Sequence, residues 1–503
     1  MSHPTALYRP SLSLLTDLYE LTMAQGYWKL GLGDREAAFC LFFREPPFGS
    51  GYAVACGLAW AADWIENLRF TDEDLGYLGE LTGSDGRALF DPGFLDHLRR
   101  LEGACDVDAV PEGTVVFGRE PLVRVTGPVV GAQLLESALL NIVNFQTLIA
   151  TKSVRVCRAA RGEPVLEFGL RRAQGIDGSL AAARAAYVGG CAATSNVLAG
   201  RLFGIPVKGT HAHSWVMLFG DELEAFDAYA RAMPNNCVFL VDTYDSLAGV
   251  RRAIEVGRRL RERGHEMVGI RLDSGDLAYL SVEARRMLDE AGFDDAAIVA
   301  SNELDEHVID SLKQQGAAVG IWGVGTKLVT GGDDAALGGV YKLTAVRAGP
   351  DGEWAGRVKL SEQAEKVSAP GLQQVRRFRD DGRFAADMIF DAAHPPPAGA
   401  VTMVDPLDPT RRRTFPADAD CEDLLVPVFR GGRRVRQPEA LEAVRRRVGE
   451  QTDALHPGIR RFMNPHEYPV GLEEGLHERK ARMVMEAREG ERSAGPTGRE
   501  GDR

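Results

Sequence analysis

Between about residues 160 and 345, short apolar runs alternate with longer segments of helical periodicity. Apolar runs bounded by turn residues are typical of buried strands, and a 3.6-residue period indicates amphipathic helices. Strands are expected at Val165–Phe168, Ile205–Lys208, Val238–Val241, Val268–Leu272, Ile298–Ser301, Val319–Trp322 and Val340–Leu343. Helices are expected near 179–188, 219–232, 246–262, 277–291 and 304–315. This alternation predicts a parallel sheet, most readily closed into a barrel.

The flanking segments follow different patterns. Residues 12–30 have helical periodicity, and Val107 to Val129 alternates apolar stretches with turns, which predicts a small antiparallel sheet. After about residue 346 the strand–helix rhythm stops, and strand-like runs follow that could return to the N-terminal sheet. The expected organisation is an N-terminal α+β domain (1–150), an α/β barrel (151–345), returning C-terminal segments (346–470) and a charged, partly disordered tail (471–503).

Composition narrows the class of protein. The 503 residues are 45% hydrophobic and 26% charged, as in ordinary globular proteins, and the net charge of −13 argues against broad binding to nucleic acid or anionic membranes. The seven cysteines are scattered without a CxxC pair, which favours reduced thiols. No apolar run approaches the roughly 20 residues of a membrane span, and the first residues lack a signal-peptide pattern. We therefore expect a cytoplasmic protein.

Polar side chains follow several predicted strands. In a barrel, ligands bind at the carboxyl ends of the strands, so these positions are candidates for chemistry. Arg171 and Arg172 suit a carboxylate or phosphate, although two surface arginines would give the same pattern. Asp242 could hold a ribose hydroxyl or stabilise a developing positive charge. Its neighbour Asp245 could simply cap the following helix, and the same holds for Asp276.

Two later strand ends are more specific. Arg271 and Asp273 are two residues apart and would point the same way, which suits an anion held by the arginine and a sugar hydroxyl held by the aspartate. Gly323-Val-Gly-Thr326 is a glycine-rich turn after a late strand, where loops of such barrels cradle phosphate with backbone N–H groups. Gly325 and Thr326 are therefore candidate phosphate ligands.

The turn Gly209-Thr-His-Ala-His-Ser-Trp215 allows three interpretations: a metal site, an acid/base or nucleophilic site, or an ordinary polar loop. A metal site needs further histidines at later strand ends. Downstream, His265 precedes a strand and His307 lies inside a predicted helix, so the metal interpretation lacks ligands. A histidine that is phosphorylated or acts as acid/base needs no further protein ligands.

Taken together, these motifs resemble nicotinate phosphoribosyltransferase, a type II phosphoribosyltransferase family. The matching stretches run in family order from about residue 10 to 380: Thr16-Asp-Leu-Tyr-Glu, Glu167-Phe-Gly-Leu-Arg-Arg-Ala-Gln-Gly, Gly209-Thr-His-Ala-His-Ser, Val241-Asp-Thr-Tyr-Asp, Arg271-Leu-Asp-Ser-Gly-Asp and Gly323-Val-Gly-Thr. The resemblance implies an irregular α/β barrel with a mixed sheet domain built from both chain ends, and a homodimer. It also implies a ligase-type glycosyltransferase that joins nicotinate to 5-phosphoribosyl 1-diphosphate, coupled to ATP hydrolysis and needing Mg²⁺, in NAD salvage.

Carried onto this chain, the resemblance assigns roles to matching residues. His213 would be the histidine phosphorylated by ATP, with Ser214 as its neighbour, while His211 has no assigned role. Nicotinate would contact Thr210 and Arg271, with its ring between Phe168 and Tyr19, and a partner subunit could supply Tyr19. The remaining implied contacts are Arg171 at the anion-binding end, Asp242 and Asp273 at the ribosyl group, and Gly325 and Thr326 at phosphate. No residue is assigned as a protein ligand of a metal.

Three alternatives stay open at this stage. Nicotinamide phosphoribosyltransferase shares the fold and several motifs, although Tyr19 and the Arg271-Leu-Asp273 pattern favour the nicotinate enzymes. A metal-dependent hydrolase is disfavoured by the missing ligands. A non-catalytic nucleotide-binding protein would not need the full set of strand-end residues.

Overall fold

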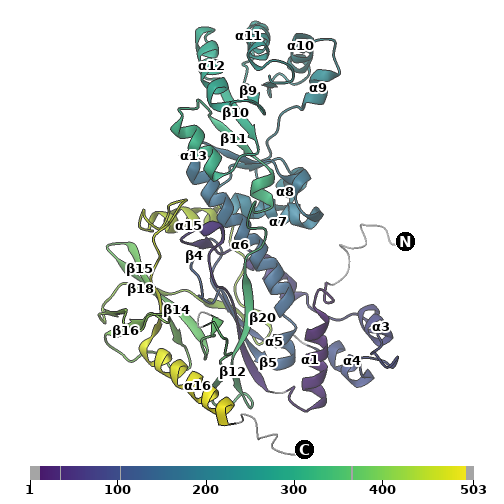
Figure 1. Cartoon of the computed structure of the whole chain (residues 1–503). Coiled ribbons are helices and arrows are strands. Elements are labelled where there is room, and N and C mark those ends of the chain that lie inside the picture. Colours follow the sequence, from purple (N-terminus) through teal and green to yellow (C-terminus); the bar gives the residue numbers. More distant parts are fainter. Residues whose placement is uncertain (1–11, 34, 102–103, 364–365, 494–503) are drawn as a thin grey trace, which may run out of the picture. The chain divides into compact units, whose positions relative to one another are not determined.

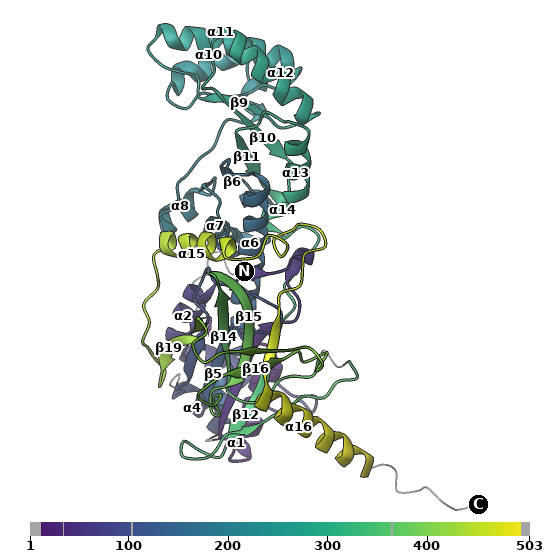
Figure 2. The same cartoon turned by 90° about the vertical axis from the view of Figure 1, so that its left-hand side faces the viewer.

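The computed structural model describes residues 12–33, 35–101, 104–363 and 366–493. The chain divides into two compact units. One contains residues 1–144, 337–440 and 450–503, and the other contains residues 145–336 and 441–449. Figures 1 and 2 show the elements of both units, which are described separately below.

The unit of residues 145–336 and 441–449, called here the half-barrel unit, is built on a six-stranded sheet in the order β7-β6-β11-β10-β9-β8. All neighbouring strands pair in parallel. The strands are β6 Val165–Glu167, β7 Ala193–Thr194, β8 Val238–Leu240, β9 Gly269–Leu272, β10 Ala297–Asn302 and β11 Ile321–Val324. A parallel sheet needs crossover helices, and these occur where the periodicity predicted them.

The helices of this unit are α6 Glu136–Ala159, which begins in the other unit, α7 Gly175–Val188, α8 Val197–Phe203, α9 His213–Met217, α10 Glu222–Ala232, α11 Ser246–Glu262, α12 Leu277–Glu290, α13 Glu306–Gln314, α14 Thr326–Val329 and α15 Leu441–Asp453, which ends in the other unit. Helices α7 to α13 connect successive strands of this unit, whereas α6, α14 and α15 lie outside the strand succession (Figure 1). The cap interpretation is confirmed for Asp245 and Asp276, whose carboxylates accept from Ala248 N at 2.7 Å and Tyr279 N at 3.1 Å.

The parallel sheet is a half-barrel. The expected strand Ile205–Lys208 is reduced to a single bridge, in which Val207 pairs in parallel with Thr194 beside β7. In the described ranges, no backbone hydrogen bond joins this segment to β8 at the other edge. The side chain of His211 takes that place, because its Nε2 accepts from Leu240 N of β8 at 3.2 Å. The fold class, an irregular α/β barrel beside a mixed sheet domain, is confirmed.

The other unit, called here the sheet unit, has a seven-stranded sheet in the order β13-β12-β1-β5-β3-β19-β20, a six-stranded sheet in the order β17-β16-β21-β15-β14-β18, and the pair β2-β4. Its strands are β1 Glu36–Phe43, β2 Ala53–Val54, β3 Asp106–Ala109, β4 Val115–Val116, β5 Val123–Pro128, β12 Gly339–Arg347, β13 Ala355–Gly356, β14 Gln373–Asp380, β15 Arg383–Asp391, β16 Val401–Val404, β17 Arg412–Phe415, β18 Cys421–Asp423, β19 Val426–Arg430, β20 Arg433–Arg434 and β21 Val470–Glu473. Its helices are α1 Leu18–Lys29, α2 Leu58–Glu66, α3 Asp72–Glu80, α4 Pro92–Arg99, α5 Val129–Gln133 and α16 Glu474–Ser493.

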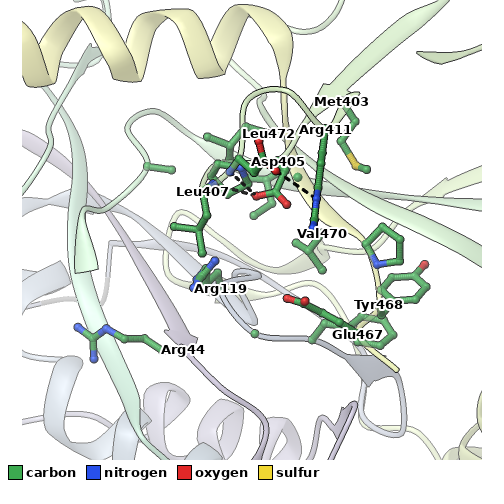
Figure 3. Close-up of a pocket in the computed structure, with 18 of the residues that line it drawn as sticks. Arg44, Arg119, Met403, Asp405, Leu407, Arg411, Glu467, Tyr468, Val470 and Leu472 are labelled. Atoms are coloured by element: carbon green, nitrogen blue, oxygen red, sulfur yellow. Dashed lines mark hydrogen bonds and ion pairs between the residues drawn. The ribbon is translucent and has the colours of Figure 1, made fainter. Parts of the chain in front are cut away.

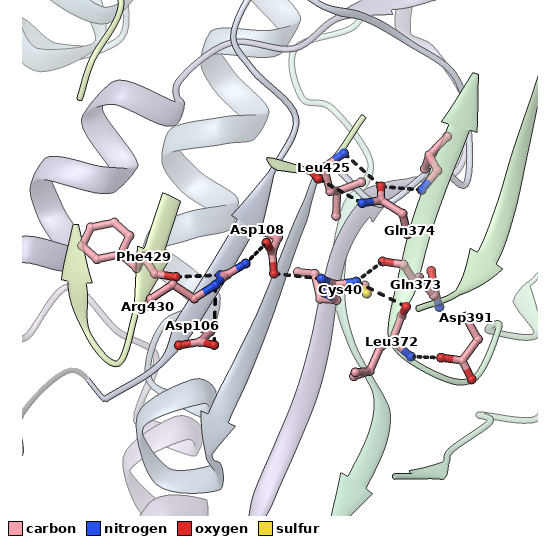
Figure 4. Close-up of polar contacts among 12 residues, drawn as sticks. Cys40, Asp106, Asp108, Leu372, Gln373, Gln374, Asp391, Leu425, Phe429 and Arg430 are labelled. Atoms are coloured by element: carbon pink, nitrogen blue, oxygen red, sulfur yellow. Dashed lines mark hydrogen bonds and ion pairs between the residues drawn. The ribbon is translucent and has the colours of Figure 1, made fainter. Parts of the chain in front are cut away.

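C-terminal segments return to the N-terminal sheet through a buried polar network (Figure 4). Arg124 on β5 donates to Asp108 on β3 at 2.8 Å and to the Gln373 carbonyl at 3.0 Å. Arg430 on β19 donates to the second oxygen of Asp108 at 2.5 Å. The opposite charges of Asp108 and the two arginines offset one another, which makes their burial tolerable. The mixed domain is thus built from both chain ends.

Two of the expected strands lie elsewhere in the structure. Val340–Leu343 lies within β12, which pairs antiparallel with β1 in the sheet unit, so the half-barrel unit ends at residue 336 and not at 345. The expected Val319–Trp322 is shifted to Ile321–Val324. Of the segment expected as a charged, partly disordered tail, Glu474–Ser493 forms the helix α16, in agreement with its helix-prone sequence. The preceding Val470–Glu473 forms β21, parallel to β15, and Leu476 of α16 is buried in the core. Residues 494–503 lie outside the described residues.

One stretch, Val129–Ala159, has the length and apolar composition of a membrane span among the residues described. It is buried inside the protein over 61% of its most apolar window. A core helix satisfies the same criterion, so the stretch is weak evidence for a membrane span.

Candidate active site

Arg271 at the end of β9 is the centre of a polar cluster in the half-barrel unit. Its Nε donates to Ser301 Oγ at 2.7 Å, its Nη1 to Thr210 Oγ1 at 3.0 Å, and its Nη2 to Asp273 Oδ1 at 2.7 Å. The guanidinium carbon also lies 5.8 Å from the centroid of the Phe168 ring, within cation–π range. The side chain is only 14% exposed. Its orientation is therefore fixed from three sides.

The two strand-end aspartates are linked. Burial raises the pKa of Asp273, but hydrogen bonds from Ser301 and Arg271 and the charge of Arg271 outweigh it, so the pKa lies below its usual value. Asp242 Oδ2 accepts from Asp273 N at 2.9 Å and from Ser274 Oγ at 2.6 Å. Asp242 Oδ1 is buried and has no partner within the described part of the chain. That oxygen remains available to a ligand.

His213 is the first residue of α9 and faces the same cluster. Its Nδ1 lies 3.1 Å from Thr243 Oγ1, and its Nε2 lies 3.8 Å from Asp273 Oδ2. The imidazole is 40% exposed, so a ligand in solution can reach it. The ends of β8 and β9 and the turn before α9 thus bring His213, Asp242, Arg271 and Asp273 together.

Phe168 is positioned by its backbone and by a close neighbour. Its N–H donates to Val324 O of β11 at 2.8 Å. A Cβ on Gly323 would lie only 2.8 Å from the Phe168 ring, so the ring packs against β11 where no side chain intervenes. The preceding Glu167 is buried, holds the Gly169 N–H and accepts from Thr194 Oγ1 at 2.5 Å, and burial raises its pKa.

The remaining candidates of this unit are less constrained. Arg171 lies in the short 3-10 helix Leu170–Arg172, is exposed and has no ion pair among the residues described. Gly325 precedes α14, and a Cβ there would approach the Phe168 carbonyl at 3.2 Å. The Thr326 hydroxyl lies 3.4 Å from Glu303 Oε1, a long contact.

Tyr19 belongs to the sheet unit, and its side chain is 45% exposed on α1. This exposure disfavours a core role for Tyr19. The next residue, Glu20, is fully buried, bonded to Thr16 Oγ1 at 2.7 Å and to Ser137 N at 3.1 Å. Burial, Glu136 and Glu20 raise the pKa of the Tyr19 phenol, which keeps it neutral. Glu20 therefore anchors the helix that presents Tyr19.

His211 differs from His213 in its burial and in its hydrogen bonds. It is 8% exposed, its Nε2 accepts from Leu240 N, and its ring lies 4.9 Å from the Tyr229 ring. Burial lowers its pKa to about 4, so it stays neutral. Because Nε2 accepts from Leu240 N, this nitrogen is not available to a metal ion. Over the described ranges, no group of three or more His, Cys, Asp or Glu residues is arranged to hold a metal ion.

The His211→Gln variant is expected to change the pH dependence of stability. Because of this low pKa, the imidazole takes up a proton below about pH 6.5 in the unfolded state but only near pH 4 in the folded state. Wild-type protein should therefore lose about 3 kcal/mol of unfolding free energy as pH falls through this window. Glutamine can still accept from Leu240 N but does not titrate. Denaturant unfolding across this pH range should give a shallower loss for the variant, and equal slopes would contradict the assignment.

Sequence reasoning missed two residues of this cluster, Thr243 and Ser301, and also Glu167, which precedes Phe168. Glu167 and Thr243 lie inside the motifs quoted above, but a strand-end position was the only signal for them. The position of Ser301 is set only by the register between β10 and β9, in which Val299 pairs with Arg271 and Ser301 lies level with Asp273.

Residues 14–144 match the profile of the nicotinate phosphoribosyltransferase (NAPRTase) N-terminal domain, and residues 373–480 match that of its C-terminal domain. The chain is 43% identical over 481 residues to nicotinate phosphoribosyltransferase of Bacillus subtilis, covering 95% of this chain and 96% of that protein. It is 40% identical over 473 residues to nicotinate phosphoribosyltransferase pncB2 of Mycobacterium tuberculosis, covering 94% of each. The crystal structure of human nicotinic acid phosphoribosyltransferase superposes with a TM-score of 0.81 at 33% identity, covering 93% of this chain and 99% of that one. The similarity therefore extends beyond residue 380, and the chain belongs to the nicotinate phosphoribosyltransferase family.

Proposed function

We propose that this enzyme converts nicotinate, 5-phosphoribosyl 1-diphosphate, ATP and water to nicotinate D-ribonucleotide, diphosphate, ADP and phosphate, a step of NAD biosynthesis. The observation that carries the proposal is the Arg271 cluster. A guanidinium held by Ser301, Thr210 and Asp273 lies beside an aromatic ring, as a flat anion such as nicotinate requires. Arg171 is available to the same anion, because it has no ion pair in the described part of the chain.

In this proposal the pyridine ring packs on Phe168, with Tyr19 on its other face. Its carboxylate accepts from the Arg271 guanidinium and the Thr210 hydroxyl, which already contact each other at 3.0 Å. Stacking orients the ring, and the charge-assisted hydrogen bonds select the acid over the amide. A homodimer in the cytoplasm, with Tyr19 supplied by the partner subunit, is part of the proposal.

Transfer of the ribosyl group develops positive charge on the sugar ring. The carboxylates of Asp242 and Asp273 stabilise that charge electrostatically. Asp242 Oδ1, buried and without a partner in the described residues, and Asp273 fit Mg²⁺, which prefers carboxylate oxygens together with substrate phosphates. When bound, Mg²⁺ would neutralise charge on the diphosphate leaving group. Backbone N–H groups at Gly325 and the Thr326 hydroxyl bind phosphate.

His213 couples ATP to the transfer. Thr243 occupies Nδ1, which leaves Nε2 as the nucleophile in the tautomer where Nδ1–H donates to the threonine hydroxyl. Nε2 attacks the γ-phosphorus of ATP, the P–O bond to ADP breaks, and water later cleaves the P–N bond and releases phosphate. The phosphoryl group adds negative charge beside Asp273 and so alters binding at the phosphate end of the site.

The decisive experiment measures diphosphate release from purified protein with nicotinate or nicotinamide, each with and without ATP. The proposal expects release with nicotinate, stimulation by ATP and little release with nicotinamide. A preference for nicotinamide, or no nicotinate-dependent release, would overturn it.

The Gly323→Ala variant should weaken nicotinate binding. The new Cβ would meet the Phe168 ring at 2.8 Å, so the ring must leave its place on β11. Overpacking of this kind costs about 1–3 kcal/mol, so KM for nicotinate should rise about tenfold or more. Gly320→Ala is the matched control, because no atom lies within 4 Å of the added Cβ three residues away. Steady-state kinetics should separate the two variants, and an unchanged KM in Gly323→Ala would remove Phe168 from the site.

A further inference from the structure

The sheet unit contains a cavity of about 1010 Å³ that the proposed reaction does not use (Figure 3). Its walls come from the end of β1, the β4–β5 turn, the loop between β16 and β17, the segment before β21, and α16. All of these elements belong to one unit, so the cavity is complete within it. None of the residues of the Arg271 cluster lines it.

The cavity is basic in an acidic protein. Seven lysines and arginines line it against four carboxylates, although the whole chain carries a net charge of −13. Part of this charge is already neutralised. Arg411 pairs with Asp408 at 3.2 Å, and Arg412 pairs with Glu474 outside the cavity lining at 2.7 Å. These two arginines are structural or solvated.

Arg119 and Lys480 differ from these two arginines, because neither has a carboxylate partner in the described residues. The Nε of Arg119 is buried without a hydrogen bond there, and Lys480 Nζ donates only to the Val367 carbonyl at 3.0 Å. The two exposed carboxylates of the lining, Glu45 and Glu467, form no ion pair with either cation. Burial and the nearby charge of Arg119 lower the pKa of Lys480 to about 8. Two cations that face one cavity without a counter-ion repel each other and favour a bound anion.

The backbone of Arg119 supports the same conclusion. Its φ is +73°, a left-handed conformation that costs a non-glycine residue free energy. The turn itself needs only the backbone, since Arg119 N donates to Phe43 O at 2.7 Å. The strain is located at the residue whose guanidinium enters the cavity, as Figure 3 shows. Strained positions of this kind cluster at ligand sites.

We infer that this cavity binds a phosphate group, free or carried by a small organic molecule, with Arg119 and Lys480 as its donors. An arginine fork and a lysine ammonium together match a phosphate dianion in charge and geometry. The remaining walls include Leu407, Met403 and Val470, and the volume exceeds what a free phosphate fills. The cavity therefore has room for the organic part of a phosphate ester beside its donors.

The first test uses wild-type protein and the reactivity of Lys480. Acetylation by acetic anhydride at pH 8 is followed residue by residue by mass spectrometry, with inorganic phosphate, glycerol 3-phosphate or chloride at matched ionic strength. Saturating phosphate should slow acetylation of Lys480 about tenfold relative to chloride, since the bound anion stabilises the unreactive ammonium. Lys29, which lies on α1 outside the cavity, is the internal control. Equal protection of both lysines, or of neither, would overturn the inference.

The second test compares variants by isothermal calorimetry with the same two ligands. Arg119→Asn together with Lys480→Gln should weaken phosphate binding at least tenfold, because two charge-assisted hydrogen bonds are lost. Asparagine tolerates positive φ, so the turn is kept. Arg411→Gln, in the same cavity but paired with Asp408, should bind within about twofold of wild type. Tighter binding of glycerol 3-phosphate than of inorganic phosphate supports an ester as the ligand, and equal affinities support free phosphate. Wild-type phosphate affinity in the double variant would refute the site. Without added phosphate, the double variant should release diphosphate at the wild-type rate.

Discussion

Replacing Arg271 by glutamine should lower kcat/KM for nicotinate by about 10²- to 10³-fold. In the proposed site the change removes the charge that would hold the nicotinate carboxylate, and it also leaves Asp273, Thr210 and Ser301 without their shared donor. Removing one partner of a half-buried ion pair costs about 3–5 kcal/mol, of which part appears as lost substrate binding. Steady-state diphosphate release over a range of nicotinate concentrations measures the effect.

Two further variants make this result specific. Arg271→Lys keeps the positive charge but cannot reach all three partners of the guanidinium fork, so it should recover only part of the loss. Arg261→Gln is a matched control, because this arginine lies exposed on the same unit and pairs with Glu266 at 2.9 Å. It should behave as wild type. Full activity in Arg271→Gln would remove nicotinate from the Arg271 cluster.

Local sequence patterns predicted the parts of the site that depend on strand ends. Asp242, Arg271 and Asp273 follow buried runs that form β8 and β9, and parallel strands place their carboxyl ends at one edge of the sheet. The grouping of these three residues could therefore be predicted from the sequence. Ser301 could not, because its contact with Arg271 depends on the register between β9 and β10, which no local pattern encodes.

Long-range strand pairing explains why the other strand predictions are wrong. Val340–Leu343 is apolar in the same way as a barrel strand, and its assignment to β12 follows only from its antiparallel pairing with β1, about 300 residues earlier. Val207 keeps one bridge to Thr194 because the half-barrel is left open there, and His211 fills the gap with a side chain. That explains why a second histidine lies in the turn although the chemistry assigns it no role.

Replacing His213 by alanine should abolish the stimulation of diphosphate release by ATP. If His213 is the proposed phosphate acceptor, its removal leaves no phosphoryl group beside Asp273, so the ratio of rates with and without ATP should fall to about one, a coupling free energy near zero. The same variant should carry no acid-labile phosphate after incubation with labelled ATP. His211→Gln, in the same turn, should retain both properties at pH 7.5, because His211 is already neutral there.

Thr243→Val tests how the imidazole is oriented. Valine keeps the shape of the side chain but cannot accept from Nδ1–H, so Nε2 would no longer be held in the nucleophilic tautomer. Acid-labile labelling should slow in this variant while nicotinate binding is retained, since Arg271 and its partners are untouched. Full ATP stimulation in His213→Ala would refute the phosphohistidine while leaving the nicotinate site intact, because the two rest on different side chains. Loss of stimulation in both His213→Ala and His211→Gln would instead indicate a general disturbance of the turn.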